Sequence, residues 1–160
     1  MRVRMKSESK FLILLLLLFP GNINAQDTFV SVGIKLGYLW GKGGGSFYPG
    51  VEISAVTWGD RSNKLYPFGF TLDYEYISHL KSSRIHLGFE KNVEIFGVDV
   101  GPTIVLGEEN NFGISIIPYA GFILIPYGEF SIFRGYTTYG TGAYIKVPIR
   151  TNTHRFSVGG

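Results

Sequence analysis

From residue 26 onward, the chain alternates apolar and polar positions with a period of two in one segment after another. The clearest case is Phe68–Tyr76, where aromatic and aliphatic residues take every second position and Gly, Thr, Asp and Glu fill the others. A period of two is the side-chain repeat of a β-strand, and Gly, Asn, Asp and Ser clusters between the segments are typical of turns. The segments that follow this pattern are Thr28–Leu39, Tyr48–Thr57, Pro67–Tyr76, Arg84–Glu90, Ile95–Leu106, Gly113–Leu124, Tyr127–Phe133 and Gly140–Arg150, and His154–Val158 begins a ninth.

Alternation does not show which face is buried, because a soluble sheet buries its apolar face and a membrane barrel turns that face toward lipid. The polar face here is rich in glycine and in charges of both signs, which favours a narrow lumen filled by a charge network. We expect this network to consist of Lys35, Glu52, Asp73, Glu75, Arg84, Glu90, Asp99, Glu129, Lys146 and Arg150. Glycine on a solvent-exposed strand would weaken the strand without packing against anything.

Aromatic residues gather toward the ends of the segments, as they do at the two interfaces of a membrane barrel. We expect one rim to contain Tyr38, Trp40, Phe47, Tyr48, Tyr74, Tyr76, Phe133 and Tyr136. We expect the other rim to contain Phe29, Trp58, Tyr66, Phe68, Phe89, Phe96 and Tyr127.

The pattern therefore predicts an all-β fold: an antiparallel up-and-down transmembrane β-barrel of about eight strands, or ten if a C-terminal strand is missing. Residues 26–160 form its single domain, and Lys91-Asn92 and Ile125-Pro126 are the expected short turns at the end that carries the N-terminus. Pro102, Pro118 and Pro148 count against an ideal barrel, because each removes a ladder donor unless a bulge or a strand end absorbs it. The alternative is a soluble exported β-barrel or sandwich.

Residues 1–25 read as a secretory signal peptide. Basic residues precede the apolar run Phe11–Phe19, Pro20-Gly21 interrupts it, and Ala25 is a plausible cleavage position before Gln26. The apolar run is too short for a transmembrane helix, which needs about 20 residues. We therefore expect the chain to be exported.

Charge and composition exclude several classes of function. Without the signal peptide, basic and acidic residues are equal in number, so nothing supports nucleic-acid binding. The chain has no cysteine, which removes thiol catalysis and Cys-ligated metals. His79, His86 and His154 are isolated from one another, so we expect neither a metal site nor a cofactor. We also expect no enzymatic activity; the one alternative is a lipid-modifying barrel enzyme that uses His86 and Ser83.

Three stretches carry a resemblance to a known group: Phe68–Tyr76, Gly97–Thr103 (GVDVGPT) and His154–Gly159 (HRFSVG). In them the chain resembles the small, porin-like outer-membrane β-barrel proteins of Gram-negative envelopes. The resemblance covers nearly the whole mature chain and is one of composition and spacing. This chain ends in Val158-Gly159-Gly160, whereas the group usually ends in a strand that closes on a C-terminal aromatic residue.

The resemblance implies a location in the outer membrane, contact with its lipids and insertion by the outer-membrane assembly machinery. His79, Lys81 and Arg84 form a small basic loop that would lie outside the cell and could contact lipopolysaccharide. The expected function is a structural or surface-interaction role with a narrow, side-chain-filled lumen. The alternatives are a soluble exported barrel that binds an apolar ligand and a small-solute porin; the sequence names no protein partner.

Overall fold

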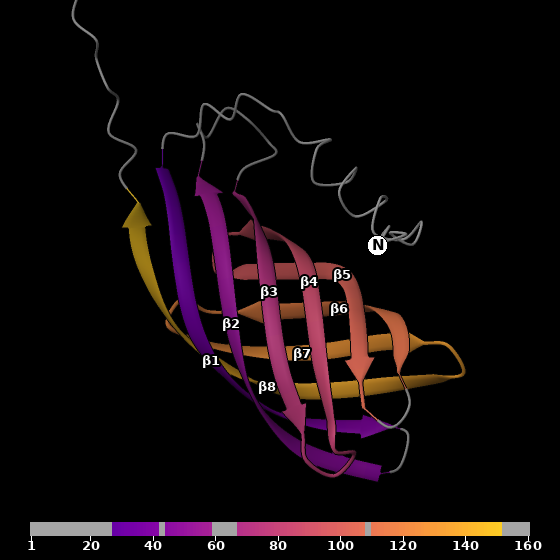
Figure 1. Ribbon diagram of the computed structural model, residues 1–160. Helices are drawn as coiled ribbons and strands as arrows, with labels where there is room; N and C mark the ends of the chain where they lie inside the picture. The colour runs from indigo at the N-terminus through magenta and orange to yellow at the C-terminus, as the bar shows by residue number, and fades with distance from the viewer. Residues whose placement is uncertain (1–26, 42–43, 59–66, 108–109, 152–160) are drawn as a thin grey trace, which may run out of the picture.

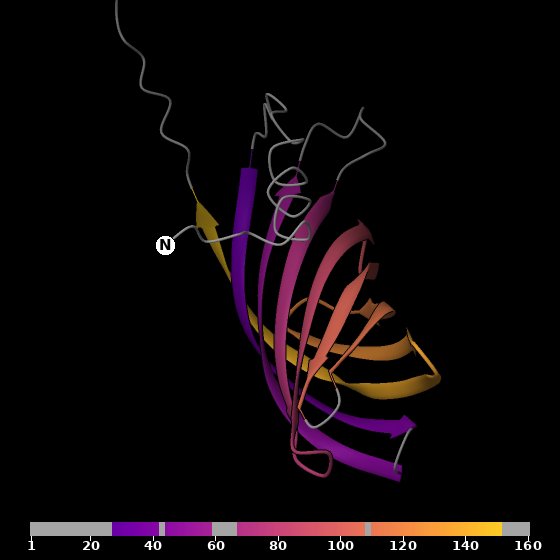
Figure 2. The same ribbon diagram turned by 45° about the vertical axis from the view of Figure 1, so that its right-hand side comes forward.

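The chain forms a closed antiparallel barrel of eight strands, each hydrogen-bonded to its neighbours in sequence and the last to the first. The computed structural model describes residues 27–41, 44–58, 67–107 and 110–151. Figures 1 and 2 show that the strands are tilted, so that β2 and β3 in front cross β7 and β8 behind them. They are β1 (Asp27–Gly41), β2 (Gly44–Trp58), β3 (Phe68–Ile77), β4 (Ser82–Val93), β5 (Phe96–Leu106), β6 (Asn111–Ala120), β7 (Leu124–Phe133) and β8 (Tyr136–Thr151).

The pairing between strands is staggered around the barrel. One circuit of paired residues runs Val30, Ala55, Phe70, Phe89, Val100, Ile116, Phe130, Tyr139 and Trp40. The circuit starts at Val30 and returns to β1 at Trp40, so closure shifts the register by ten residues (40 − 30). Such a stagger tilts the strands, and an eight-stranded barrel leaves an interior just wide enough for side chains.

The two faces of the wall differ sharply in chemistry. Side chains on the outer face are apolar and exposed, among them Val32, Ile53, Leu72, Leu87 and Ile114. The positions between them point inward; at mid-barrel most are glycine, hydroxyl-bearing or charged, and toward the two ends several are apolar. The structure thus confirms the predicted antiparallel up-and-down barrel of eight strands, and it places the polar face inside.

The prolines fit without a bulge, because every ladder keeps one register along its whole length. The β4–β5 ladder lacks its pairs only opposite Pro102 and Gly101, and the β6–β7 ladder lacks them only opposite Pro118 and Ile117. Pro148 pairs with β1 and lies beyond the part of β8 that pairs with β7. The missing proline N–H donors therefore interrupt the strand pairing at two short places and leave the register unchanged.

The connections divide into two groups. The terminal end of the barrel holds the start of β1, the end of β8 and the β2–β3, β4–β5 and β6–β7 connections. The distal end holds the other four connections, and the β1–β2 and β3–β4 hairpins project at the bottom of Figure 1. The short terminal-end turns are Glu94-Ile95 and residues 121–123, so the predictions at Lys91-Asn92 and Ile125-Pro126 were wrong. Gly121 turns the chain at a φ of +127°, and its N–H donates to the carbonyl of Ile95.

Closure between β1 and β8 leaves no open edge for a ninth or tenth barrel strand among the described residues. The fragment His154–Val158 and the signal-peptide segment 1–25 lie outside those residues. No helix long and apolar enough to cross a membrane occurs in the described ranges.

Candidate functional site: the charged lumen

The barrel interior holds nine of the ten charged residues that the alternation assigned to it. Lys35, Glu52, Asp73, Glu75, Arg84, Glu90, Asp99, Glu129 and Lys146 are all buried, each less than a tenth exposed. Arg150 lies in β8 opposite Phe29, and its side chain is outside the described part of the structure. Buried charges are tolerated in proteins only when they are paired and hydrogen-bonded. The geometry of these pairs therefore defines the lumen.

A cluster of charges at mid-barrel spans the interior from β1 to β7. The Nζ atom of Lys35 lies 2.6 Å from Asp73 Oδ2 and 2.5 Å from Glu75 Oε1, both on β3. Arg84, on β4, pairs with Glu75 and places its Nη1 atom 2.6 Å from Glu129 Oε1 on β7. Each cation thus joins two carboxylates, and together they link four strands that are not all neighbours in the wall.

Tyrosines pack around this cluster. The hydroxyl oxygens of Tyr48 and Tyr127 lie 2.5 Å apart, and the ring centroids of Tyr127 and Tyr144 lie 4.5 Å apart. The ammonium of Lys35 lies 4.9 Å from the centre of the Tyr127 ring and 5.0 Å from that of Tyr144. Gly37 leaves room for this layer, since a Cβ there would collide with the Tyr48 and Tyr127 rings or hydroxyls. The aromatic layer closes the lumen beside the ion pairs.

The aromatic rims predicted from the sequence need correction. Tyr48, Tyr127 and Phe133 are buried in the interior, and Phe29 and Tyr136 line the two mouths of the lumen. The sequence could have indicated the inward position of Tyr127, because in a strand Tyr127 lies on the same face as Glu129, two residues away. Outside, Tyr38 contacts Trp40 and Phe47, with ring centroids 4.8 and 4.7 Å away, as predicted for a rim. Trp58 and Tyr66 lie outside the described side chains.

A chain of hydroxyl groups connects the histidine of the interior to this cluster. His86 Nδ1 lies 2.9 Å from Thr103 Oγ1, which lies 2.5 Å from Ser115 Oγ. The Ser115 and Ser131 hydroxyls are 2.6 Å apart, and Ser131 donates to Glu129 Oε1 at 2.6 Å. On its other side, His86 Nε2 lies 3.3 Å from Asp99 Oδ1, and Thr71 donates to Asp99. The alternation of the sequence placed these hydroxyls on the polar face with the charges, but it did not predict that they would link His86 to Glu129.

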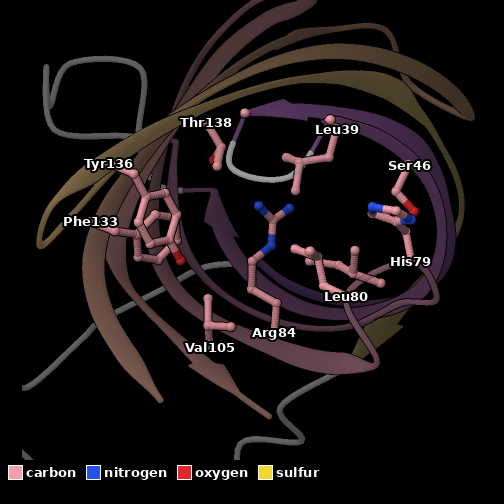
Figure 3. Close-up of a pocket in the computed structure, with 12 residues that line it drawn as sticks. Leu39, Ser46, His79, Leu80, Arg84, Val105, Phe133, Tyr136 and Thr138 are labelled. Carbon is pink, nitrogen blue, oxygen red and sulfur yellow. The ribbon is translucent and has the colours of Figure 1, made fainter. Parts of the chain in front are cut away.

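The distal mouth is nearly filled. Figure 3 shows Arg84 pointing into the middle of a ring of side chains that includes Leu39, Leu80, Val105 and Phe133. The cavity left between them has a volume of about 20 Å³, enough for a water molecule. Arg84 is only 2% exposed, so the expectation that it belongs to an external basic loop with His79 and Lys81 was wrong.

At the terminal mouth, by contrast, the described residues line a cavity of about 480 Å³. Lys146 and Glu90 line it, and Lys146 is paired with Glu52. The hydroxyl of Tyr119 lies 2.8 Å from Glu90 Oε2 and 2.7 Å from Asn92 Oδ1. The two mouths therefore differ: side chains nearly fill the distal one, and the described residues of the terminal one line a larger cavity.

The candidate catalytic residues, and any group of metal-binding side chains, are judged by their positions in the described part of the chain. His86 points inward and Ser83 lies on the other face of β4, so the two side chains do not meet. No group of three His, Cys, Asp or Glu side chains is arranged to hold a metal ion in the described ranges.

Comparison with known proteins yields similar solved structures only. Neisserial surface protein A is similar over 75% of this chain and 96% of its own, at 10% identity and a TM-score of 0.44. The attachment invasion locus protein of Yersinia pestis is similar over 76% of this chain at 8% identity and a TM-score of 0.38, both in complex with the heparin analogue sucrose octasulfate and in a second structure. No family model and no curated protein matches the chain. These similarities assign no function.

Proposed function

We propose that this protein is an outer-membrane β-barrel with a structural or surface-interaction role, whose lumen is filled by its own side chains. The observation that carries the proposal is the inverted distribution of charge and apolar surface. Ile34 is 59% exposed on the outer wall, whereas its neighbour Lys35 is fully buried. A closed barrel with this distribution suits a hydrocarbon environment, because every backbone group within the wall can pair internally.

The soluble alternative requires the opposite arrangement. A barrel that carried an apolar ligand in its interior would turn its charged, glycine-rich face toward water. Here that face lines the lumen, and the large exposed side chains are aliphatic and aromatic. Monomeric soluble proteins rarely expose continuous apolar surface on this scale.

The same contacts argue against a wide pore. Lys35, Arg84 and their carboxylate partners cross the interior, and the tyrosine layer packs against them. A solute that entered from the terminal mouth would have to break several buried ion pairs to pass. Removing one partner of such a pair costs about 3–5 kcal/mol. We therefore assign the protein a role at its surface and in the membrane, with lipids, including the anionic headgroups of lipopolysaccharide near the exposed Lys81, as its proposed contacts.

Planar-bilayer conductance of the refolded full chain tests this function. We expect the wild-type barrel to insert, as judged by a folded band on unboiled gels, and to show no stable openings of large-porin size. The double variant Tyr48→Ala/Arg84→Ala removes the crossing side chains and should conduct measurably more than the wild type. Stable large openings from the wild-type barrel would make it a diffusion channel.

Cell fractionation tests the location separately. We expect the protein in the envelope fraction, released by detergent and not by salt or by high pH. Recovery in the aqueous phase without detergent would contradict the membrane assignment.

A further inference from the structure

The hollow terminal mouth has no part in the filled-lumen function. Its cavity of about 480 Å³ falls within the range of small-molecule sites, whereas the distal mouth holds about 20 Å³. The cavity lies at the end of the barrel where β1 begins and β8 ends, at the top of Figure 1. Its chemistry can be read from the side chains that line it.

The walls of this cavity are apolar. Phe29 and Val56 line it from β1 and β2, and Ile123 and Ile125 line it from the β6–β7 turn and the start of β7. Along these strands, the inward positions change from charged residues at mid-barrel to apolar residues near the mouth. An aromatic or aliphatic group placed between these walls would be removed from water.

The floor of the cavity is polar, and among the described residues carboxylates outnumber cations there. Glu90 is 2% exposed, and the hydroxyl of Tyr119 is its hydrogen-bond partner at 2.8 Å. The nearby ammonium of Lys146 is paired with Glu52, and it lies 4.9 Å from the centre of the Tyr144 ring and 5.7 Å from that of the Tyr119 ring. Within the described residues, no ion pair neutralises Glu90.

A second carboxylate lies behind the first. Asp99 is directly opposite Glu90 in the β4–β5 register, and both side chains are buried on the inner face. Like charges at such positions destabilise a sheet unless a cation offsets them, and the partner near Asp99 is His86, whose Nε2 atom lies 3.3 Å from Asp99 Oδ1. The floor of the cavity therefore favours a positively charged group.

We propose that the terminal-mouth cavity binds a small organic cation, a primary ammonium attached to an aromatic or aliphatic body. The ammonium lies at the Glu90 carboxylate and next to the Tyr119 ring, and the body lies between Phe29 and Ile125. The Glu90 carboxylate supplies a charge-assisted hydrogen bond to the ligand's ammonium. This inference goes beyond the proposed function, because it depends only on the folded barrel and not on conductance or location.

The test is a titration of the full chain, folded in lipid nanodiscs, with three probes of similar size and different charge. Benzylamine is the cation, benzyl alcohol the neutral probe and benzoate the anion, and ligand-observed NMR measures the affinity of each. We expect benzylamine to bind more tightly than benzyl alcohol and benzoate to bind most weakly. Glu90→Gln should weaken benzylamine binding about tenfold, since a hydrogen bond to a charged group is lost, and should abolish the preference over benzyl alcohol.

A matched pair of tryptophan variants tests the position of the site. Val56→Trp fills the cavity from its wall and should abolish binding of benzylamine. Thr57→Trp adds the same side chain one residue further along β2, on the outer face, and should leave the affinity unchanged. Folding of each variant is checked by the mobility of the unboiled protein on a gel.

Three results would overturn the proposal. Equal affinity for the three probes would show partition into the apolar walls or the lipid alone. A preference for benzoate would show a floor with net positive charge. Unchanged benzylamine affinity in folded Val56→Trp would place the site elsewhere, and that result stands even if Glu90→Gln fails to fold.

Discussion

The hydroxyl oxygens of Tyr48 and Tyr127 lie 2.5 Å apart inside the barrel, although β8 and β1 separate their strands in the wall. The contact reaches across the lumen from β2 to β7 and lies beside the Lys35 and Arg84 ion pairs. Bulky rings fit at this level because Gly37 and Gly142 present no side chain to them. Packing across the lumen therefore depends on these glycines as well as on the charges.

This packing predicts that Gly37→Ala destabilises the barrel. The added methyl group would overlap the Tyr48 ring and the Tyr127 hydroxyl, and overpacking of this kind costs about 1–3 kcal/mol. Urea unfolding of the refolded protein in lipid measures the loss. The control is Gly128→Ala, where the nearest atom to a new Cβ is Pro118 Cγ at 4.0 Å, and its stability should match the wild type. Equal stability of the two variants would contradict the packing argument.

The ion pair between Lys146 and Glu52 predicts a non-additive response to substitution. Both side chains are less than a tenth exposed, so Lys146→Met leaves an unpaired buried carboxylate and should cost about 3–5 kcal/mol. The double variant Lys146→Met/Glu52→Gln removes both charges and should be more stable than Lys146→Met alone. Unfolding free energies of the wild type, the two single variants and the double variant give the coupling energy. A double variant no more stable than Lys146→Met would show that the charges are not coupled.

Because the outer wall is apolar, we expect a charged side chain in the middle of a strand to impair assembly of the barrel. Leu72 is 47% exposed at the middle of β3, and Leu72→Arg should impair assembly because Arg near the bilayer midplane costs about 2–4 kcal/mol. Thr71→Ser is the control on the inner face, since serine keeps the hydroxyl that donates to Asp99. The yield of heat-modifiable, folded protein in the envelope reports assembly. Normal assembly of Leu72→Arg together with failure of Thr71→Ser would reverse the assignment of the two faces.

The interrupted ladders predict that one proline can be replaced with a gain in stability. Pro102→Val supplies an N–H opposite Leu87, where the β4–β5 pairing is missing, and should add about 0.5–1.5 kcal/mol. Pro148→Val is the matched control. That part of β8 does not pair with β7, so the new N–H finds no strand partner on the β7 side. Unfolding midpoints in denaturant compare the two. No gain for Pro102→Val over Pro148→Val would show that the interruption has another cause.

The alternating pattern determined much of this protein by itself. The parity of each segment assigned Lys35, Asp73, Glu75 and Glu129 to one face, and the structure buries all of them. This succeeded because a β-strand turns each side chain to the face opposite its neighbour's, whatever the rest of the fold does. The wrong placements of Tyr48 and Tyr127 came from favouring residue type over parity, and strict alternation would have corrected them.

Tertiary structure alone decided which charges meet. Lys35 and Asp73 are 38 residues apart in sequence and come from strands that are not adjacent in the wall, yet they form an ion pair at 2.6 Å. Their meeting depends on the ten-residue stagger of the closed barrel, which sets the height of each inward side chain against those across the lumen. Alternation fixes a side chain's face locally, whereas its partner across the lumen is fixed only when the sheet closes with a particular register.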